Sequence, residues 1–185
     1  MKTYTGDRTI DGVKVLVDGR NDLLYPAAFM LSCNRGERDP ATFARMRAAD
    51  GADWVLAGNQ PDSLSHKFLR RDPAWALVQY NDAAAVYVLR SAYPQLKDLE
   101  LRYVARLLDG DSVAAVRADA LKEGPQAEAR LAADLQRVID ETPGDLSGHV
   151  WLAQLYQEQG QRERRDQVLR HLMRERPELP SIEGN

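Results

Sequence analysis

The spacing of hydrophobic residues divides the chain into two parts. In the first part, short apolar runs typical of strands alternate with amphipathic stretches typical of helices. Asn81-Asp82 separates the last two runs and indicates a β-hairpin. The order predicts a small β-α-β-α-β-β sheet that begins parallel and ends with an antiparallel strand. The strand-like runs are Val13–Val17, Asp53–Ala57, Trp75–Tyr80 and Ala84–Leu89.

The second part has a helical period and carries no strand signal. Apolar residues recur there three or four positions apart, and glycine or proline stops each stripe. We therefore predict an α/β domain over residues 1–92 and an all-α domain over residues 93–185. The predicted helical stripes cover Leu96–Leu108, Val113–Ala120, Leu131–Ile139, Leu152–Tyr156 and Val168–Met173.

A 34-residue period links Pro143 and Pro177, and each of these prolines follows an amphipathic segment. The last unit resembles the tetratricopeptide repeat, although His149 replaces its usual tryptophan and Arg165 its small alanine. The preceding unit matches only in its second helix. A plain helical bundle with accidental spacing is the alternative. The residues that carry the resemblance are Leu152, Ala153, Tyr156, Gly160, Leu169 and Pro177.

Three segments of the first part, Gly12–Pro26, Gly51–Ala57 and Asp72–Arg90, carry a second resemblance. Over residues 12–110 the chain resembles the soluble domain of bacterial polytopic glycosyltransferase-like (mannosyltransferase-related) membrane proteins. The resemblance implies a non-catalytic accessory role at the extracytoplasmic face of the inner membrane, with membrane association through a segment before Gly12. A native start at Met1 favours the cytoplasm instead.

Composition excludes several classes of function. Lysine and arginine total 25 against 28 acidic residues, a net charge of -3, which disfavours nucleic-acid binding. One cysteine, Cys33, rules out an internal disulfide framework, and with three histidines a His- or Cys-based metal site is not expected. We predict no metal and no cofactor, and we identify no catalytic constellation. Ser63 and His66 are interpreted as parts of one helix, with Ser63 as its cap.

The polar segment Asp18–Asp22 follows the first predicted strand, at the end where open α/β sheets bind ligands. Arg20 suits a phosphate or carboxylate, while Asp18 and Asp22 suit a cation or sugar hydroxyls, with Asn21 between them. A simple turn, shaped by Asp18 and Asn21, explains the same residues.

Near the end of the chain, six arginines between Arg162 and Arg176 are interleaved with acidic residues. This pattern indicates a solvated helix face, and contact with anionic lipids or an acidic partner is the alternative. Together these patterns predict a non-catalytic module that binds a protein partner through helical repeats. The alternative is small-anion or sugar-nucleotide binding, possibly enzymatic, at Asp18–Asp22.

A thermal-shift screen with sugar nucleotides and inorganic anions tests this alternative. If the segment binds them, the ligands raise the melting temperature of the wild-type chain. The Arg20→Ala variant loses this shift, because the guanidinium supplies the bidentate contact. An unchanged shift in the variant, or no shift in the wild type, removes Asp18–Asp22 as a ligand site.

Overall fold

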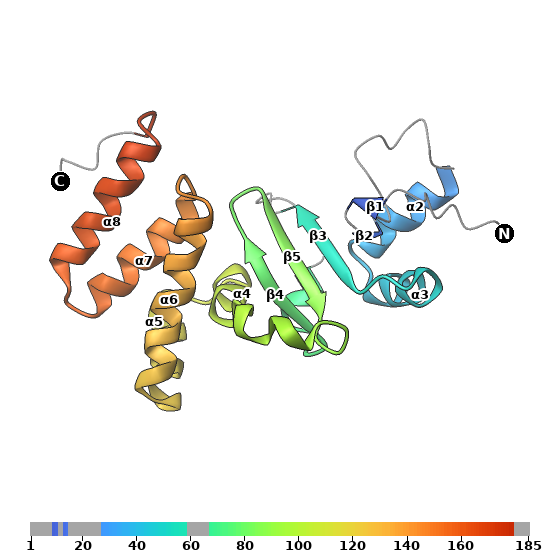
Figure 1. Ribbon diagram of the computed structural model, residues 1–185, viewed down its shortest axis with the longest axis horizontal. Helices are drawn as coiled ribbons and strands as arrows, with labels where there is room; N and C mark the ends of the chain where they lie inside the picture. Colours follow the sequence, from blue (N-terminus) through green and yellow to red (C-terminus); the bar gives the residue numbers. More distant parts are fainter. Residues whose placement is uncertain (1–8, 11–12, 15–26, 59–66, 180–185) are drawn as a thin grey trace.

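The computed structural model describes residues 9–10, 13–14, 27–58 and 67–179. Figure 1 shows a central sheet with α2 and α3 on one side and helices α5 to α8 on the other. In chain order, the elements are β1 (Thr9–Ile10), β2 (Val13–Lys14), α2 (Ala27–Gly36), α3 (Pro40–Asp50), β3 (Trp54–Gly58), η1 (Lys67–Arg70), β4 (Trp75–Tyr80), β5 (Ala84–Leu89), η2 (Pro94–Leu99), α4 (Arg102–Leu108), α5 (Val113–Glu123), α6 (Pro125–Glu141), α7 (Leu146–Glu158) and α8 (Arg162–Glu175).

The sheet has three strands in the order β3-β5-β4, and both pairings are antiparallel. The predicted β4–β5 hairpin is confirmed, with Trp75 opposite Leu89 and Tyr80 opposite Ala85. The predicted parallel start is wrong for the described residues, because β2 pairs with β1 in a separate two-stranded sheet. β3 joins the free edge of β5, so β5 separates β3 from β4. Hydrophobic periodicity identifies strands, but it carries no information about which strands are neighbours.

The predicted helical stripe from Leu96 to Leu108 is interrupted in the structure. η2 is a 3-10 helix that ends at Leu99, and α4 begins only at Arg102. Leu101 lies in the break, is fully buried, and donates its backbone N–H to the carbonyl of Leu77 on β4 at 2.7 Å. Leu99, which the stripe assigned to the buried face, is 47% exposed. The chain therefore leaves the helix between η2 and α4, and the N–H of Leu101 bonds to the sheet in place of a helical carbonyl.

The four helices predicted after Asp109 are all present. α5 packs against α6, α7 packs against both of them, and α8 packs against α7. Gly160, at a φ of 71°, makes the left-handed turn between α7 and α8. Leu131, Leu135 and Leu152 are fully buried among these helices. No helix in the described ranges is long and apolar enough to cross a membrane.

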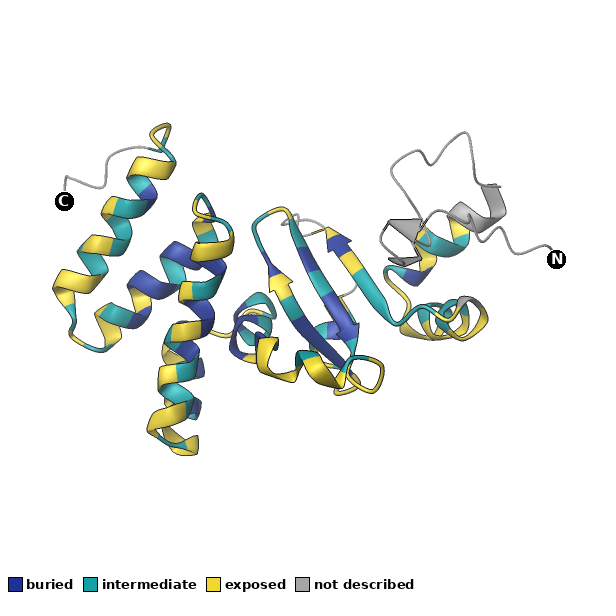
Figure 2. Ribbon diagram, viewed as in Figure 1, coloured by how far each residue is buried: buried dark blue, intermediate teal, exposed yellow. Residues whose placement is uncertain are grey.

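One hydrophobic core continues from the sheet into the helices. It begins at Ala57 and Leu69, passes through α4, and reaches Leu155 on α7. The rings of Tyr80 on β4 and Trp151 on α7 lie 5.6 Å apart between centroids. Figure 2 shows that the buried positions concentrate on β4, β5 and the helices from α4 to α7. The two parts of the chain are thus joined by apolar packing as well as by the backbone.

Two arginines of α6 strengthen this junction. Arg137 donates through Nη2 to the carbonyls of Val78, at 3.0 Å, and Leu99, at 2.6 Å. Arg130 donates to the carbonyls of Asp98 and Glu100. These carbonyls of β4 and the η2 region therefore have charged donors on α6, and the bonds hold α6 against the sheet.

Hydrogen bonds from backbone N–H groups to the carboxylates of Asp82 and Asp145 also connect the sheet to α7. The carboxylate of Asp82, in the β4–β5 turn, accepts the backbone N–H groups of Leu146 (2.6 Å) and Ser147 (3.2 Å). In return, the carboxylate of Asp145 accepts the N–H of Asp82 at 2.6 Å and that of Gly148 at 2.5 Å. The first three N–H groups of α7, which no helical carbonyl can reach, are therefore satisfied by two carboxylates.

Substitution of Gly148 tests how closely α7 approaches α6. A Cβ atom at this position would lie 2.8 Å from Val138 Cγ1 and 2.9 Å from Asp145 Oδ1. We expect Gly148→Ala to lower the free energy of unfolding in urea by about 1–3 kcal/mol, because the overlap outweighs the helix propensity of alanine. Gly144→Ala is the control, because the nearest atom there is 3.6 Å away. Equal effects of the two substitutions would contradict close packing at Gly148.

Candidate functional site

The structure describes only some of the site residues predicted from the sequence. Asp18, Arg20, Asn21 and Asp22 lie outside the described residues, as do Ser63 and His66. The repeat residues come together on the α7–α8 hairpin: Leu152 and Ala153 are buried, Tyr156 and Leu169 are half-buried, Gly160 forms the turn, and Pro177 follows α8.

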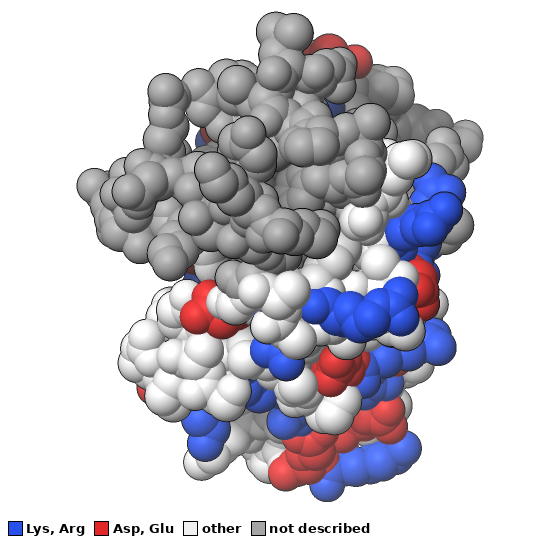
Figure 3. All heavy atoms as spheres, turned by 90° about the vertical axis from the view of Figure 1, so that its right-hand side faces the viewer, with Lys and Arg blue, Asp and Glu red and all other residues white. Residues whose placement is uncertain are grey.

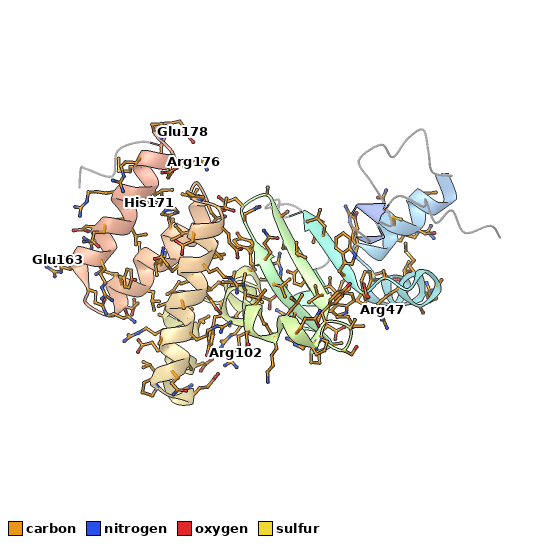
Figure 4. The ribbon with its side chains drawn as sticks, in the orientation of Figure 1. Arg47, Arg102, Glu163, His171, Arg176 and Glu178 are labelled. Atoms are coloured by element: carbon orange, nitrogen blue, oxygen red, sulfur yellow. The ribbon has the colours of Figure 1, made fainter. Side chains whose placement is uncertain are left out.

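A pocket that was not predicted from the sequence opens between α6, α7 and α8, with a volume of about 290 Å³. Figure 4 shows His171 on the side of α8 that faces α6 and α7, whereas Glu163 points away from them. The lining contains neither serine, threonine, cysteine nor lysine among the described residues. It consists of Gln136, Ile139, Asp140, His149, Tyr156, Arg164, Gln167, Val168 and His171.

Two histidines form the floor and one wall of this pocket. His149 is fully buried, and its Nδ1 lies 2.5 Å from the carbonyl oxygen of Asp145. A carbonyl only accepts, so Nδ1 carries the proton and Nε2 of the neutral ring is the acceptor. His171 Nδ1, 2.9 Å from that Nε2, is then the donor. The contact with the carbonyl thereby sets the tautomers of both rings, whose centroids lie 5.2 Å apart.

The environment keeps His149 uncharged. Burial lowers the pKa of His149, and a positive charge on the neighbouring His171 would lower it further. His171 lies nearer the surface, with Nε2 3.9 Å from a carboxylate oxygen of Glu175. A neutral His149 held by the backbone orients His171, and the described lining places no serine, threonine or cysteine beside the pair as a nucleophile.

Asp145 couples this pair to the sheet. Its side chain is 1% exposed, and burial, with the nearby charge of Asp82, raises the pKa of Asp145 to about 6. The backbone N–H groups that it accepts act in the opposite direction. The carbonyl of Asp145 orients His149 while its carboxylate caps α7. A continuous hydrogen-bonded path therefore runs from the β4–β5 turn to His171 on α8.

Charges on α8 follow the sequence expectation only in part. Arg165 pairs with Asp166 at 2.6 Å, and Arg176 pairs with Glu178. Among the described residues, no ion pair involves Arg162, Arg164, Arg170 or Arg174. At the end of the molecule opposite α8, which Figure 3 shows, basic and acidic side chains lie beside one another over the coloured part of the surface. Arg162, Arg164, Arg170 and Arg174 are all exposed on α8.

The described residues contain no group of three or more histidine, cysteine, aspartate or glutamate side chains placed to hold a metal ion. Comparisons of the chain with protein-family models, curated proteins and solved structures find no match. The two resemblances drawn from the sequence therefore stay predictions.

Sequence reasoning found only one half of the histidine pair. His149 is visible as the residue that departs from the repeat pattern at its tryptophan position. His171 lies 22 residues later and gives no signal of its own. Only the packing of α8 on α7 brings the two rings together, so no spacing rule within a single helix predicts the pair.

The pKa of Asp145 predicts a specific dependence of stability on pH. In the folded chain Asp145 keeps its proton up to about pH 6, whereas the unfolded chain loses it near the usual 3.8. Its contribution to stability is therefore largest at low pH and is lost between these values. The unfolding free energy of the wild type, minus that of Asp145→Asn, should fall by about 2–3 kcal/mol from pH ~4 to pH ~7.

Urea denaturation of both proteins across this pH range provides the measurement. The opposite effect of His149, whose lowered pKa reduces stability as the pH falls, is present in both proteins and cancels in the difference. A difference that is constant with pH would mean that folding does not raise the pKa of Asp145.

Proposed function

We propose that the chain is a non-catalytic module that binds a protein partner through tetratricopeptide-like helical hairpins. Helix ends 34 residues apart support the repeat, since α6 ends at Glu141 and α8 at Glu175. The hairpin α5–α6 precedes the hairpin α7–α8, and α7 packs on both helices of the first. Stacked hairpins of this kind bury their apolar faces against neighbours and present their remaining faces to partners.

The surface of α8 is the observation that carries the proposal. Leu172 is the one fully buried residue that α8 contributes, whereas α7 contributes five buried residues. Figure 2 shows the same contrast. A hollow of about 380 Å³ on α8 is lined by Gln167, Arg170, Met173 and Arg174. An apolar side chain surrounded by unpaired arginines has the composition of a protein-binding surface, in which arginine and methionine are enriched.

The setting is a further part of the proposal. The resemblance of residues 12–110 supports a membrane-associated glycosyltransferase-like system as the setting of the module. The reading frame before Met1 tests this setting directly. Encoded transmembrane helices immediately upstream support it, and an unrelated upstream gene with a native start at Met1 contradicts it.

Selection from a displayed library of random peptides tests the binding function. We expect enriched peptides whose affinity, measured by fluorescence anisotropy, falls at least about tenfold in Met173→Glu and in Arg170→Glu, because both change the hollow on α8. Leu31→Glu on α2 is the control, since Leu31 is 59% exposed at the other end of the molecule. Urea unfolding confirms that the variants are folded.

Two outcomes would contradict the proposal. One is a selection that enriches no peptide. The other is a set of enriched peptides that bind both α8 variants as tightly as the wild type, which would place the binding surface elsewhere.

A further inference from the structure

Two opposite charges line the pocket between α6, α7 and α8 without neutralising each other. Arg164 comes from α8, and its guanidinium lies 5.8 Å from the centroid of the Tyr156 ring. Asp140 comes from α6, and its Oδ1 accepts a hydrogen bond of 2.9 Å from the side chain of Gln136. Neither charge forms an ion pair within the part of the chain that the structure describes. An opening that separates opposite charges favours a ligand that contacts both.

The remaining lining restricts the size and nature of such a ligand. Ile139 and Val168 add apolar side chains to the lining, and Gln167 adds a polar one. The wall formed by His171 is held in place through its hydrogen bond to the buried His149. A volume of about 290 Å³ is at the lower limit of ligand pockets, so it suits a molecule no larger than an amino acid.

From this arrangement we propose that the pocket binds a free α-amino acid with an apolar side chain. The ligand carboxylate pairs with Arg164, whose planar guanidinium suits a bidentate contact. The ligand ammonium pairs with Asp140, and the apolar side chain packs against Ile139 and Val168. A ligand with only one charge leaves either Arg164 or Asp140 without a partner, so it binds more weakly.

This site adjoins the hollow on α8 on which the proposed protein binding depends, and Gln167 lines both. Arg170, Met173 and Arg174 line that hollow and do not line the pocket. The two proposals therefore stand or fall independently, because each has its own variants and its own probe.

Isothermal titration calorimetry with three matched compounds tests the inference. L-leucine carries both charges, 4-methylpentanoate is the same molecule without its amino group, and isoamylamine lacks the carboxylate. We expect L-leucine to bind at least about tenfold more tightly than either analogue, a difference of about 1.4 kcal/mol. The other apolar amino acids should also bind more tightly than their singly charged analogues.

Three variants connect the binding to the two charged walls. Arg164→Gln and Asp140→Asn should each weaken L-leucine binding about tenfold or more. Asp140→Asn should not weaken the binding of 4-methylpentanoate, because this analogue has no ammonium group to pair with Asp140. Arg162→Gln is the matched control, since Arg162 is an exposed arginine of α8 outside the pocket lining. Arg164 and Asp140 are also exposed, so these substitutions leave the core intact.

The inference is overturned if no apolar amino acid binds at concentrations up to about 10 mM. It is equally overturned if the singly charged analogues bind as tightly as L-leucine. Unchanged affinity in both Arg164→Gln and Asp140→Asn would place any binding outside this pocket.

Discussion

The exchange of backbone N–H groups between Asp82 and Asp145 is the constraint on which the position of the last hairpin depends. Each carboxylate accepts from the other segment, although 63 residues separate them in sequence. A helix N-terminus leaves its first N–H groups without helical acceptors, so burying one beside a sheet requires acceptors from elsewhere. The turn of the β4–β5 hairpin supplies them, and α7 begins at the point where they are available. The cost is the burial of the Asp145 carboxylate, with the charge of Asp82 nearby, and both raise the pKa of Asp145.

The pocket between α6, α7 and α8 depends on this constraint through a short series of contacts. Once α7 is capped, the carbonyl of Asp145 meets His149, and the acceptor nitrogen of His149 orients His171 on the next helix. Gly148 lets α7 approach α6 closely enough for both helices to line the same cavity. Arg164 and Asp140 then face this cavity from helices that have no direct connection in sequence. The two proposed binding surfaces adjoin on α8, where they share Gln167 and otherwise use different residues.

Much of the secondary structure was predictable, and the reasons are local. The β4–β5 hairpin follows from two apolar runs around Asn81-Asp82, and the helices after Asp109 follow from stripes that end at glycine or proline. The strand order was not predictable, because β3 pairs with β5 through backbone groups that every strand possesses. Leu101 was missed for a related reason. Its burial depends on a bond to Leu77 of the sheet and on no periodicity of its own segment.

The sequence by itself determined the two periodicities, the positions of most helices, the hairpin and the 34-residue spacing near the end of the chain. These properties depend on neighbours within a few positions, so the order of residues is enough to reveal them. Tertiary structure alone decided that Asp82 caps α7, that His149 meets His171, and that Arg164 and Asp140 line one pocket. Such contacts join residues of separate elements, and their geometry exists only after the shared core has brought those elements together.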